Sequence, residues 1–274
     1  MTSIAIDLGG TNLRVARVEE GKVVAQVAEP CKANGTKDEV TAHICQLIQQ
    51  VFTAEVSRIG VAVPSVVDYE KGIVYNVQNI PSWDEVPLKA ILEDRFGVET
   101  HVDNDVNCFV WGEKTLGAGQ PYKNIVGITL GTGVGAGIVI DGKLHRGANT
   151  GAGEIDCMAY LDADYEHYTS SQFFKAHGTT GKDEAEKLAA GDESAKALWT
   201  EFGYHLGKLM QVILFAYDPD CIIIGGGIAA SAPLFEHAMQ VSMRQNFPYP
   251  HEAENVKIVF STLKDCNLLG ASQL

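Results

Sequence analysis

Short apolar runs alternate with turn signals along the first thirty residues. The runs at residues 3–7, 13–18 and 22–27 are separated by Gly9-Gly10 and by Glu20-Gly21. Short β-rich runs divided by such turns predict a strand that is followed by a hairpin.

The pattern then changes to helical spacing. Thr36 and Glu39 have the spacing of a capping box. The apolar residues that follow fall on one helical face, namely Val40, Ile44, Leu47, Ile48 and Val51. A continuous apolar run at 59–63 predicts a buried strand, so the pattern changes to the β/α alternation of a covered sheet. The next strand is predicted at 98–102.

The opening pattern returns in the second half of the chain. A strand is predicted at 125–130, a glycine turn at 131–137 and a second strand at 137–140, with a third strand at 143–145 after Asp141-Gly142. A long apolar stripe predicts a helix over 192–217 that stops at Asp218-Pro219, and a buried strand at 221–224 leads into Gly225-Gly226-Gly227. The repetition suggests duplicated α/β domains that face each other across a cleft.

Composition fits an ordinary globular protein and disfavours some partners. The 274 residues are 46% hydrophobic and 20% charged. With 35 acidic against 21 basic residues, the net charge is −14, which opposes binding to a phosphate backbone, and we expect no nucleic-acid partner. The six cysteines are scattered, and no apolar run approaches membrane-spanning length. We expect a cytoplasmic protein without a membrane partner.

The first glycine pair lies in a segment suited to a phosphate and Mg²⁺. Asp7 ends a buried strand, and Gly9-Gly10-Thr11-Asn12 leads into a hairpin, whereas Rossmann and Walker motifs lead into a helix. Glycines let backbone N–H groups approach an anion, and a carboxylate can hold a divalent cation through water. The alternative is a simple hairpin turn.

Two further glycine segments follow predicted strands. Residues 131–137 contain four glycines, more than a two-residue turn requires. This second loop matches the first in position, and one polyphosphate held between them explains both better than the alternative of structural glycines at tight sheet turns. Gly225-Gly226-Gly227 is a third close-approach site, suited to the nucleoside.

Asp105 lies where a predicted strand ends and a helix through residues 109–116 begins. A carboxylate there faces the positive end of the helix dipole, which favours its ionised form. It can act as a general base toward a hydroxyl group. The alternative is that Asp105 is the N-cap of the helix.

These motifs together resemble the ROK (repressor, open reading frame, kinase) family of the sugar kinase, Hsp70 and actin superfamily. The first two glycine loops resemble its phosphate motifs, the third its adenosine motif, and Asn104-Asp105-Val106-Asn107 its most specific signature. The resemblance implies two ribonuclease H-like (actin-like ATPase) α/β domains whose mixed sheets flank a nucleotide cleft. We place the domains at 1–115 and 116–274, with a C-terminal helix able to pack back on the first.

The resemblance also implies roles for individual residues. The general base is Asp105, the sugar-binding residues are Asn79, Asn104, Glu154 and Glu166, and Asp7 organises Mg²⁺ through water. The nucleotide-binding residues are Gly9, Gly10, Thr11, Asn12, Gly131, Thr132, Gly133, Gly225, Gly226 and Gly227. The chain departs from the family at Ser65, where a glycine is usual, and at Cys157, where a sugar-binding histidine is usual.

The family's zinc loop, a histidine with three closely spaced cysteines, has no counterpart here, since residues 158–175 contain no cysteine. Cys157, His167 and His177 are dispersed, so we expect no structural zinc. The loop from 157 to 169 must then be ordered by packing, with Tyr160, Leu161 and Tyr165 as apolar anchors.

The implied function is ATP-dependent phosphorylation of a hexose or N-acetylhexosamine at its 6-hydroxyl, with ATP and Mg²⁺ required. Sugar-responsive repressors of the same family carry a DNA-binding segment ahead of the first phosphate motif, and we expect none because Asp7 lies near the start. A catalytically impaired sugar sensor is the second alternative, suggested by Ser65 and Cys157. The family resemblance is also compatible with a homodimer.

Overall fold

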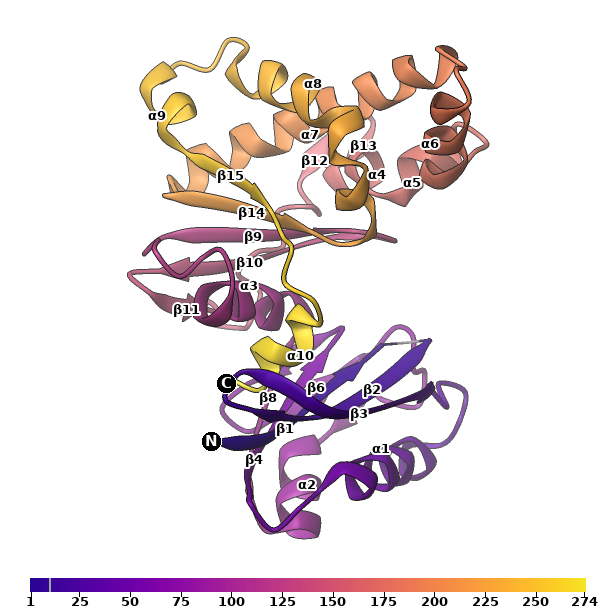
Figure 1. The fold of residues 1–274 in the computed structure, drawn as a ribbon, viewed down its shortest axis with the longest axis vertical. Helices are drawn as coiled ribbons and strands as arrows, with labels where there is room; N and C mark the ends of the chain where they lie inside the picture. Colours follow the sequence, from indigo (N-terminus) through magenta and orange to yellow (C-terminus); the bar gives the residue numbers. More distant parts are fainter. Residues whose placement is uncertain (10) are drawn as a thin grey trace. The chain divides into compact units, whose positions relative to one another are not determined.

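The computed structural model describes residues 1–9 and 11–274, so the predicted phosphate contact of Gly10 lies outside the described residues. The chain forms two compact units (Figure 1). The first comprises 1–120, 144–152 and 263–274, and the second comprises 121–143 and 153–262. The division expected after residue 115 included a C-terminal helix able to pack back on the first domain, and residues 263–274 do belong to the first unit. It did not include residues 144–152, which belong to this unit as well.

The first unit contains a five-stranded mixed sheet in the order β3-β2-β1-β4-β8. Its strands are β1 (Thr2–Leu8), β2 (Asn12–Glu19), β3 (Lys22–Pro30), β4 (Val56–Val63) and β8 (Glu99–Asn104). The first three form an antiparallel meander, whereas β1, β4 and β8 run parallel. A smaller sheet contains β5 (Val66–Asp68), β6 (Ile73–Tyr75) and β7 (Glu85–Val86).

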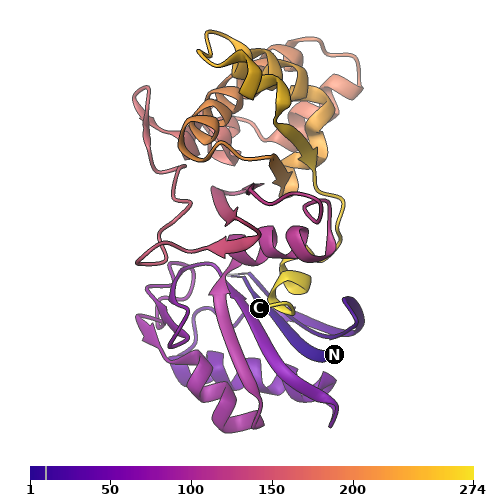
Figure 2. The same cartoon turned by 90° about the vertical axis from the view of Figure 1, so that its left-hand side faces the viewer.

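Helices cover both faces of this sheet (Figures 1 and 2). On one face lie α1 (Lys37–Val51), which has the predicted capping box of Thr36 and Glu39, and α2 (Leu88–Phe96). On the other face lie α3 (Asp105–Leu116) and α10 (Cys266–Ala271). The two helices on that face touch closely, because a Cβ on Gly270 would overlap the carbonyl of Cys108.

The second unit repeats the sheet order as β11-β10-β9-β14-β15. Its strands are β9 (Ile125–Leu130), β10 (Val134–Ile140), β11 (Lys143–His145), β14 (Cys221–Gly225) and β15 (Lys257–Phe260). The predicted glycine turn over 131–137 is too long. Pairing continues up to Leu130 and Val134, so Gly135 and Gly137 lie within β10, opposite Thr129 and Gly127.

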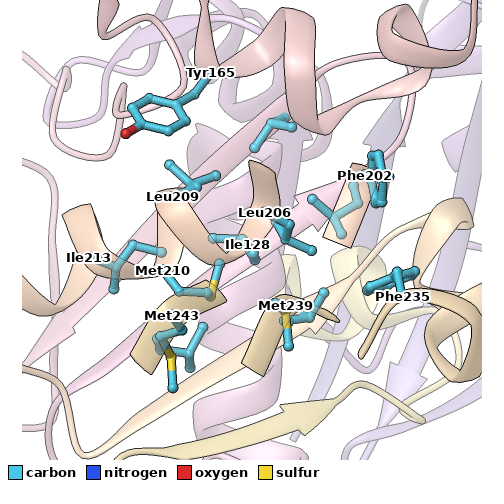
Figure 3. Close-up of a cluster of buried hydrophobic side chains, with 14 of the residues drawn as sticks. Ile128, Tyr165, Phe202, Leu206, Leu209, Met210, Ile213, Phe235, Met239 and Met243 are labelled. Atoms are coloured by element: carbon cyan, nitrogen blue, oxygen red, sulfur yellow. The ribbon is translucent and has the colours of Figure 1, made fainter. Parts of the chain in front are cut away.

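The helices of the second unit pack on this sheet around α7 (Ser194–Tyr217), which ends at Asp218 as predicted. Figure 3 shows its apolar stripe against β9 and α8 (Ala232–Arg244). The remaining elements are β12 (Ala159–Tyr160), β13 (Ala163–Asp164), α4 (Tyr165–Thr169), α5 (Ser171–Ala176), α6 (Gly181–Ala189), the 3₁₀ helix η1 (Gly227–Ser231) and α9 (Pro250–Asn255).

Both sheets therefore have a three-stranded meander joined to two parallel strands, which confirms the expected duplication of an α/β unit. Among the described helices, none combines the length and apolarity that a membrane span requires.

Candidate functional site

Candidate residues of the first unit follow the carboxyl ends of its three parallel strands. Asp7 is paired with Ala62 in register, and Asn104 with Val63. The segments after Asp7, Val63 and Asn104 therefore emerge at one edge of the sheet, which is where α/β proteins bind ligands. The edge carries Asp7, Ser65 and Asp105.

The carboxylate of Asp7 pairs with Arg14, its cross-strand partner on β2. Arg14 donates to Oδ2 of Asp7 through Nε, at 3.1 Å, and through Nη2. It also donates to Asp265 at 2.9 Å. Because Nε and Nη2 of Arg14 both bind Oδ2, a water ligand of a cation would be bound by Oδ1 of Asp7. Arg14 would then hold the orientation of the carboxylate. In the adjoining turn, Gly9 N–H donates to Asn12 O at 2.9 Å, so phosphate donors there must come from neighbouring groups such as Thr11.

The N-cap of α3 is Asn104, not Asp105. Oδ1 of Asn104 accepts from the N–H groups of Val106, at 2.8 Å, and Asn107, at 3.3 Å. Asp105 is the first residue of the helix, and its Oδ1 accepts from Val106 N–H at 2.9 Å. The alternative that Asp105 is the helix N-cap is therefore wrong, because the side chain of Asn104, one residue earlier, already accepts the hydrogen bonds of that position.

Asn104 is held on its other side by the segment containing Ser65. Nδ2 of Asn104 donates to the carbonyl of Ser65 at 3.3 Å. The Ser65 hydroxyl donates to the Tyr75 carbonyl, so it is engaged within the unit. A glycine at this position could accept from Asn104 in the same way, but it could not make the hydroxyl bond to Tyr75. Asn79 lies exposed in a turn closed by the Ile80 N–H and Val77 O, and its sugar contact stays a prediction.

The two glycine segments of the second unit lie side by side because β9 and β14 are parallel neighbours. Gly226 has φ +87°, and a Cβ there would overlap the carbonyl of Leu130, just before Gly131. Gly131 N–H donates to Gly133 O at 2.9 Å, two residues later, whereas Gly9 N–H in the first unit donates to the carbonyl three residues later. This leaves Thr132 and Gly133 as the N–H donors predicted for phosphate.

A pocket of about 540 Å³ opens beside Gly227, a volume typical of small-molecule sites. Its walls come from α5, α6, α7 and η1, and include Phe174, Lys182, Ala185 and Trp199. Apolar and aromatic walls beside the predicted adenosine motif suit a nucleobase. Sequence reasoning missed the contribution of α5 and α6 to this pocket, because their residues match no motif.

Glu166 lies against the second phosphate loop. Its Oε2 accepts from Val134 N–H at 3.3 Å, and its Oε1 accepts from Gln172 Nε2 at 2.6 Å. A Cβ on Gly133 would overlap the same carboxylate. Glu154 is exposed after Gly153, whose φ is +106° and whose missing Cβ allows contact with Ala136. The sugar contacts of both glutamates stay predictions.

Acidic residues gather between these two glutamates. Asp156 is 5% exposed. Burial raises its pKa to about 6, and the charges of Glu154 and Glu166 add to the effect. Burial and the neighbouring carboxylates of Asp156, Glu154 and Glu166 raise the pKa of the Cys157 thiol to about 11. The thiol is therefore protonated at neutral pH.

We expect Asp156→Asn to raise the free energy of unfolding at pH 7.5. The folded-state pKa of this acid lies above its unfolded value of 3.8, so ionisation penalises folding fully above about pH 6 and not at all below about pH 4. The gain should be on the order of 2 kcal/mol at pH 7.5 and should shrink by pH 5. Urea unfolding of both proteins at the two pH values measures it, and a gain independent of pH would contradict the assignment.

An aromatic cluster orders the segment where the family carries its zinc loop. Tyr160 stacks on Tyr165 with ring centroids 4.3 Å apart, and its hydroxyl lies 3.0 Å from Nδ1 of His205 on α7. The prediction of these two tyrosines as anchors is confirmed. The prediction of Leu161 is wrong, since it is 69% exposed with φ +54° at the tip between β12 and β13.

We predict that the purified protein contains well under one zinc per chain. In the part of the chain that the structure describes, the one group with ligand atoms close enough to hold a metal comprises Glu154, Asp156 and Cys157, without His167 or His177. Nδ1 of His177 lies 2.9 Å from the Phe173 carbonyl. Elemental analysis of protein made without a His-tag tests this, and stoichiometric zinc that leaves together with activity would refute it.

A family model described as "ROK family" matches residues 3–274. A glucokinase of Thermotoga maritima is 30% identical, over 99% of this chain and 96% of that protein. A beta-glucoside kinase of Listeria monocytogenes is 31% identical, over 86% and 85% of the two chains.

Solved structures agree with these matches. A ROK family glucokinase from Streptomyces griseus, in complex with glucose and AMPPNP, superposes with a TM-score of 0.83 at 25% identity. The match covers 100% of this chain and 98% of that one. It confirms the predicted fold, two ribonuclease H-like domains of the actin-like ATPase type.

Proposed function

The chain belongs to the ROK family, and on that premise we propose that it is a sugar kinase that transfers the γ-phosphate of ATP to the 6-hydroxyl of a hexose or N-acetylhexosamine. The observation that carries the proposal is the start of α3. Asn104 is the N-cap of the helix, so the cap does not require the Asp105 carboxylate, which lies in the first turn at the carboxyl edge of the parallel strands. Relatives at comparable identity are glucokinases and a beta-glucoside kinase.

Asp105 accepts the proton of the attacking hydroxyl in this proposal, as the general base. Asn79, Asn104, Glu154 and Glu166 bind the other hydroxyls, the carboxylates through charge-assisted hydrogen bonds. Phosphoryl transfer is mainly a problem of positioning and charge neutralisation. The N–H groups near Thr11, Thr132 and Gly133 serve the phosphates, and the pocket beside Gly227 serves the base.

The carboxylate of Asp7 fits Mg²⁺, which prefers oxygen ligands and usually retains several waters. When bound, the ion neutralises phosphate charge. We predict that sugar-dependent ADP release is lost in excess EDTA and returns with added Mg²⁺ or Mn²⁺. Full activity in EDTA, with the metal content of the stock solutions verified, would contradict this role.

The proposal is tested by ADP release with and without each of glucose, mannose, fructose, allose, N-acetylglucosamine and N-acetylmannosamine. At least one sugar should stimulate release well above the sugar-free rate. Sugar binding by calorimetry without stimulation by any sugar would favour a catalytically impaired sensor, which the buried Asp156 and neutral Cys157 thiol beside Glu154 make the second candidate.

A further inference from the structure

Asp103, next to the proposed catalytic segment, is a buried carboxylate with three donors. It is 1% exposed. Its Oδ1 accepts from Asn104 N–H at 2.8 Å and from Asn107 Nδ2 at 2.9 Å. Its Oδ2 accepts from Arg146 Nε at 2.6 Å, which forms an ion pair. A buried carboxylate is stable only when it is paired in this way.

Arg146 comes from a segment that is distant in sequence but belongs to the same unit, 144–152. Its guanidinium lies over the ring of Tyr69, 4.5 Å from the centroid. The segment is fastened by a bond from Ala152 N–H to Arg146 O, at 3.2 Å, and by the Thr150 hydroxyl, which donates to Val67 O. Arg146 is therefore held in place independently of α3.

Two hydrogen bonds accepted by Asp103 constrain the first turn of α3, one on each side of Asp105. One fixes the backbone of Asn104, which precedes Asp105, and the other fixes the side chain of Asn107, which follows it. The orientation of the Asp103 carboxylate is in turn set by Arg146, because Nε has a single N–H direction. The orientation of the Asp105 side chain thus depends on Arg146, which acts through Asp103.

Charge gives Arg146 a second effect on Asp105. A negative Asp103 beside Asp105 disfavours the ionised base, and Arg146 offsets that charge. Other charged or titratable groups near this cluster are Tyr69, whose ring lies against Arg146, Asp7, which is paired with Arg14, and the thiol of Cys108. Burial and the charges of Asp103, Asp105 and Asp7 raise the pKa of that thiol well above its usual value, so it is neutral.

We propose that Arg146 is a positioning residue for phosphoryl transfer, which acts through Asp103 to aim Asp105 and to keep it in the carboxylate form. The inference rests on the proposed function for its kinetic part, whereas its electrostatic part stands independently. The competing explanation is that the Arg146–Asp103 pair serves stability alone, as buried ion pairs often do.

Two variants with opposite charge effects separate these explanations. In Arg146→Gln, the Asp103 charge loses its partner, so the titration midpoint of Asp105 should rise by about one unit. In Asp103→Asn the negative charge beside Asp105 is removed, so the titration midpoint of Asp105 should fall. Carbon-13 NMR of the aspartate carboxyl groups reports these midpoints without turnover, and the Asp105 signal is identified by its loss in Asp105→Asn.

Kinetics then test the positioning. Misplacement of a catalytic group by about 1 Å can cost on the order of 10²-fold, so kcat of Arg146→Gln should fall far more than its sugar affinity. Arg146→Lys should retain the Asp105 midpoint, and Asp103→Asn/Arg146→Gln, which leaves no unpaired charge, should regain part of kcat. Arg17→Gln, which breaks a partly exposed pair with Glu19, is the control and should leave kcat and the midpoint unchanged.

Midpoints that stay at the wild-type value in both Arg146→Gln and Asp103→Asn would overturn the inference, whatever the wild-type activity. So would a loss of kcat that merely follows the fraction of folded protein. Should Arg146→Gln fail to fold, Asp103→Asn still decides the sign of the shift. Absence of wild-type turnover with every sugar, together with opposite midpoint shifts, would instead reject the proposed function and leave the electrostatic coupling intact.

Discussion

Asp105→Asn should retain the fold and lose about 10²–10⁴-fold in sugar-dependent ADP release, the usual contribution of a positioned general base. The variant is nearly isosteric. Its side-chain oxygen can still accept from Val106 N–H, and the helix cap is unaffected because it belongs to Asn104. Unfolding is therefore expected at a similar denaturant concentration, with the whole effect in kcat.

The matched control is Asp94→Asn, which makes the same chemical change at an exposed position of α2. It should release ADP at the wild-type rate. Turnover by Asp105→Asn that is comparable to that of the control would remove Asp105 from the mechanism, whereas unfolding of Asp105→Asn would show a structural role.

Gly226→Ala should destabilise the second unit by on the order of 3 kcal/mol and weaken ATP binding at the same time. Gly226 has φ +87°, which costs energy for any other residue, and its Cβ would overlap backbone, which cannot move aside as a side chain can. Relief of this overlap requires separation of the segments after β14 and β9, which carry the predicted adenosine and phosphate motifs.

Gly227→Ala provides the control for stability. Gly227 has no positive φ, and nothing lies within 4 Å of its would-be Cβ. Its free energy of unfolding should remain within about 0.5 kcal/mol of the wild-type value. Urea unfolding of both variants, with calorimetric titration of a nonhydrolysable ATP analogue, measures the two effects. Equal stability of the two variants would show that the close approach at Gly226 is not required.

Local sequence signals were sufficient for most of the fold. The capping box at Thr36, the hairpins and the stop at Asp218 depend on residues within a few positions of each other, and all are present. The glycine turn was overestimated because a glycine inside a strand gives the same local signal as a glycine in a turn. The sheet pairing opposite Gly135 and Gly137 settles that ambiguity.

The support of the site could not be predicted, because it depends on contacts between distant segments. Arg146 meets Asp103 across forty-three positions, and Ser65 meets Asn104 across thirty-nine. At the start of α3, the sequence allowed Asp105 as the N-cap, but the structure places Asn104, the residue before it, in that position. Both residue types are common N-caps, so residue type alone does not distinguish them. Among the expected anchors, the αL conformation of Leu161 at a hairpin tip turned an apolar residue outward.

The central claim, transfer of phosphate from ATP to the 6-hydroxyl of a hexose, is tested most directly by identification of the product. The best sugar of the ADP-release screen, incubated with ATP and Mg²⁺, should give one phosphate monoester for each ADP, and phosphorus–proton correlation NMR should couple its phosphorus to the two protons on C6. Coupling to the anomeric or a ring proton would contradict the assigned position, and release of inorganic phosphate alone would contradict phosphoryl transfer to a sugar.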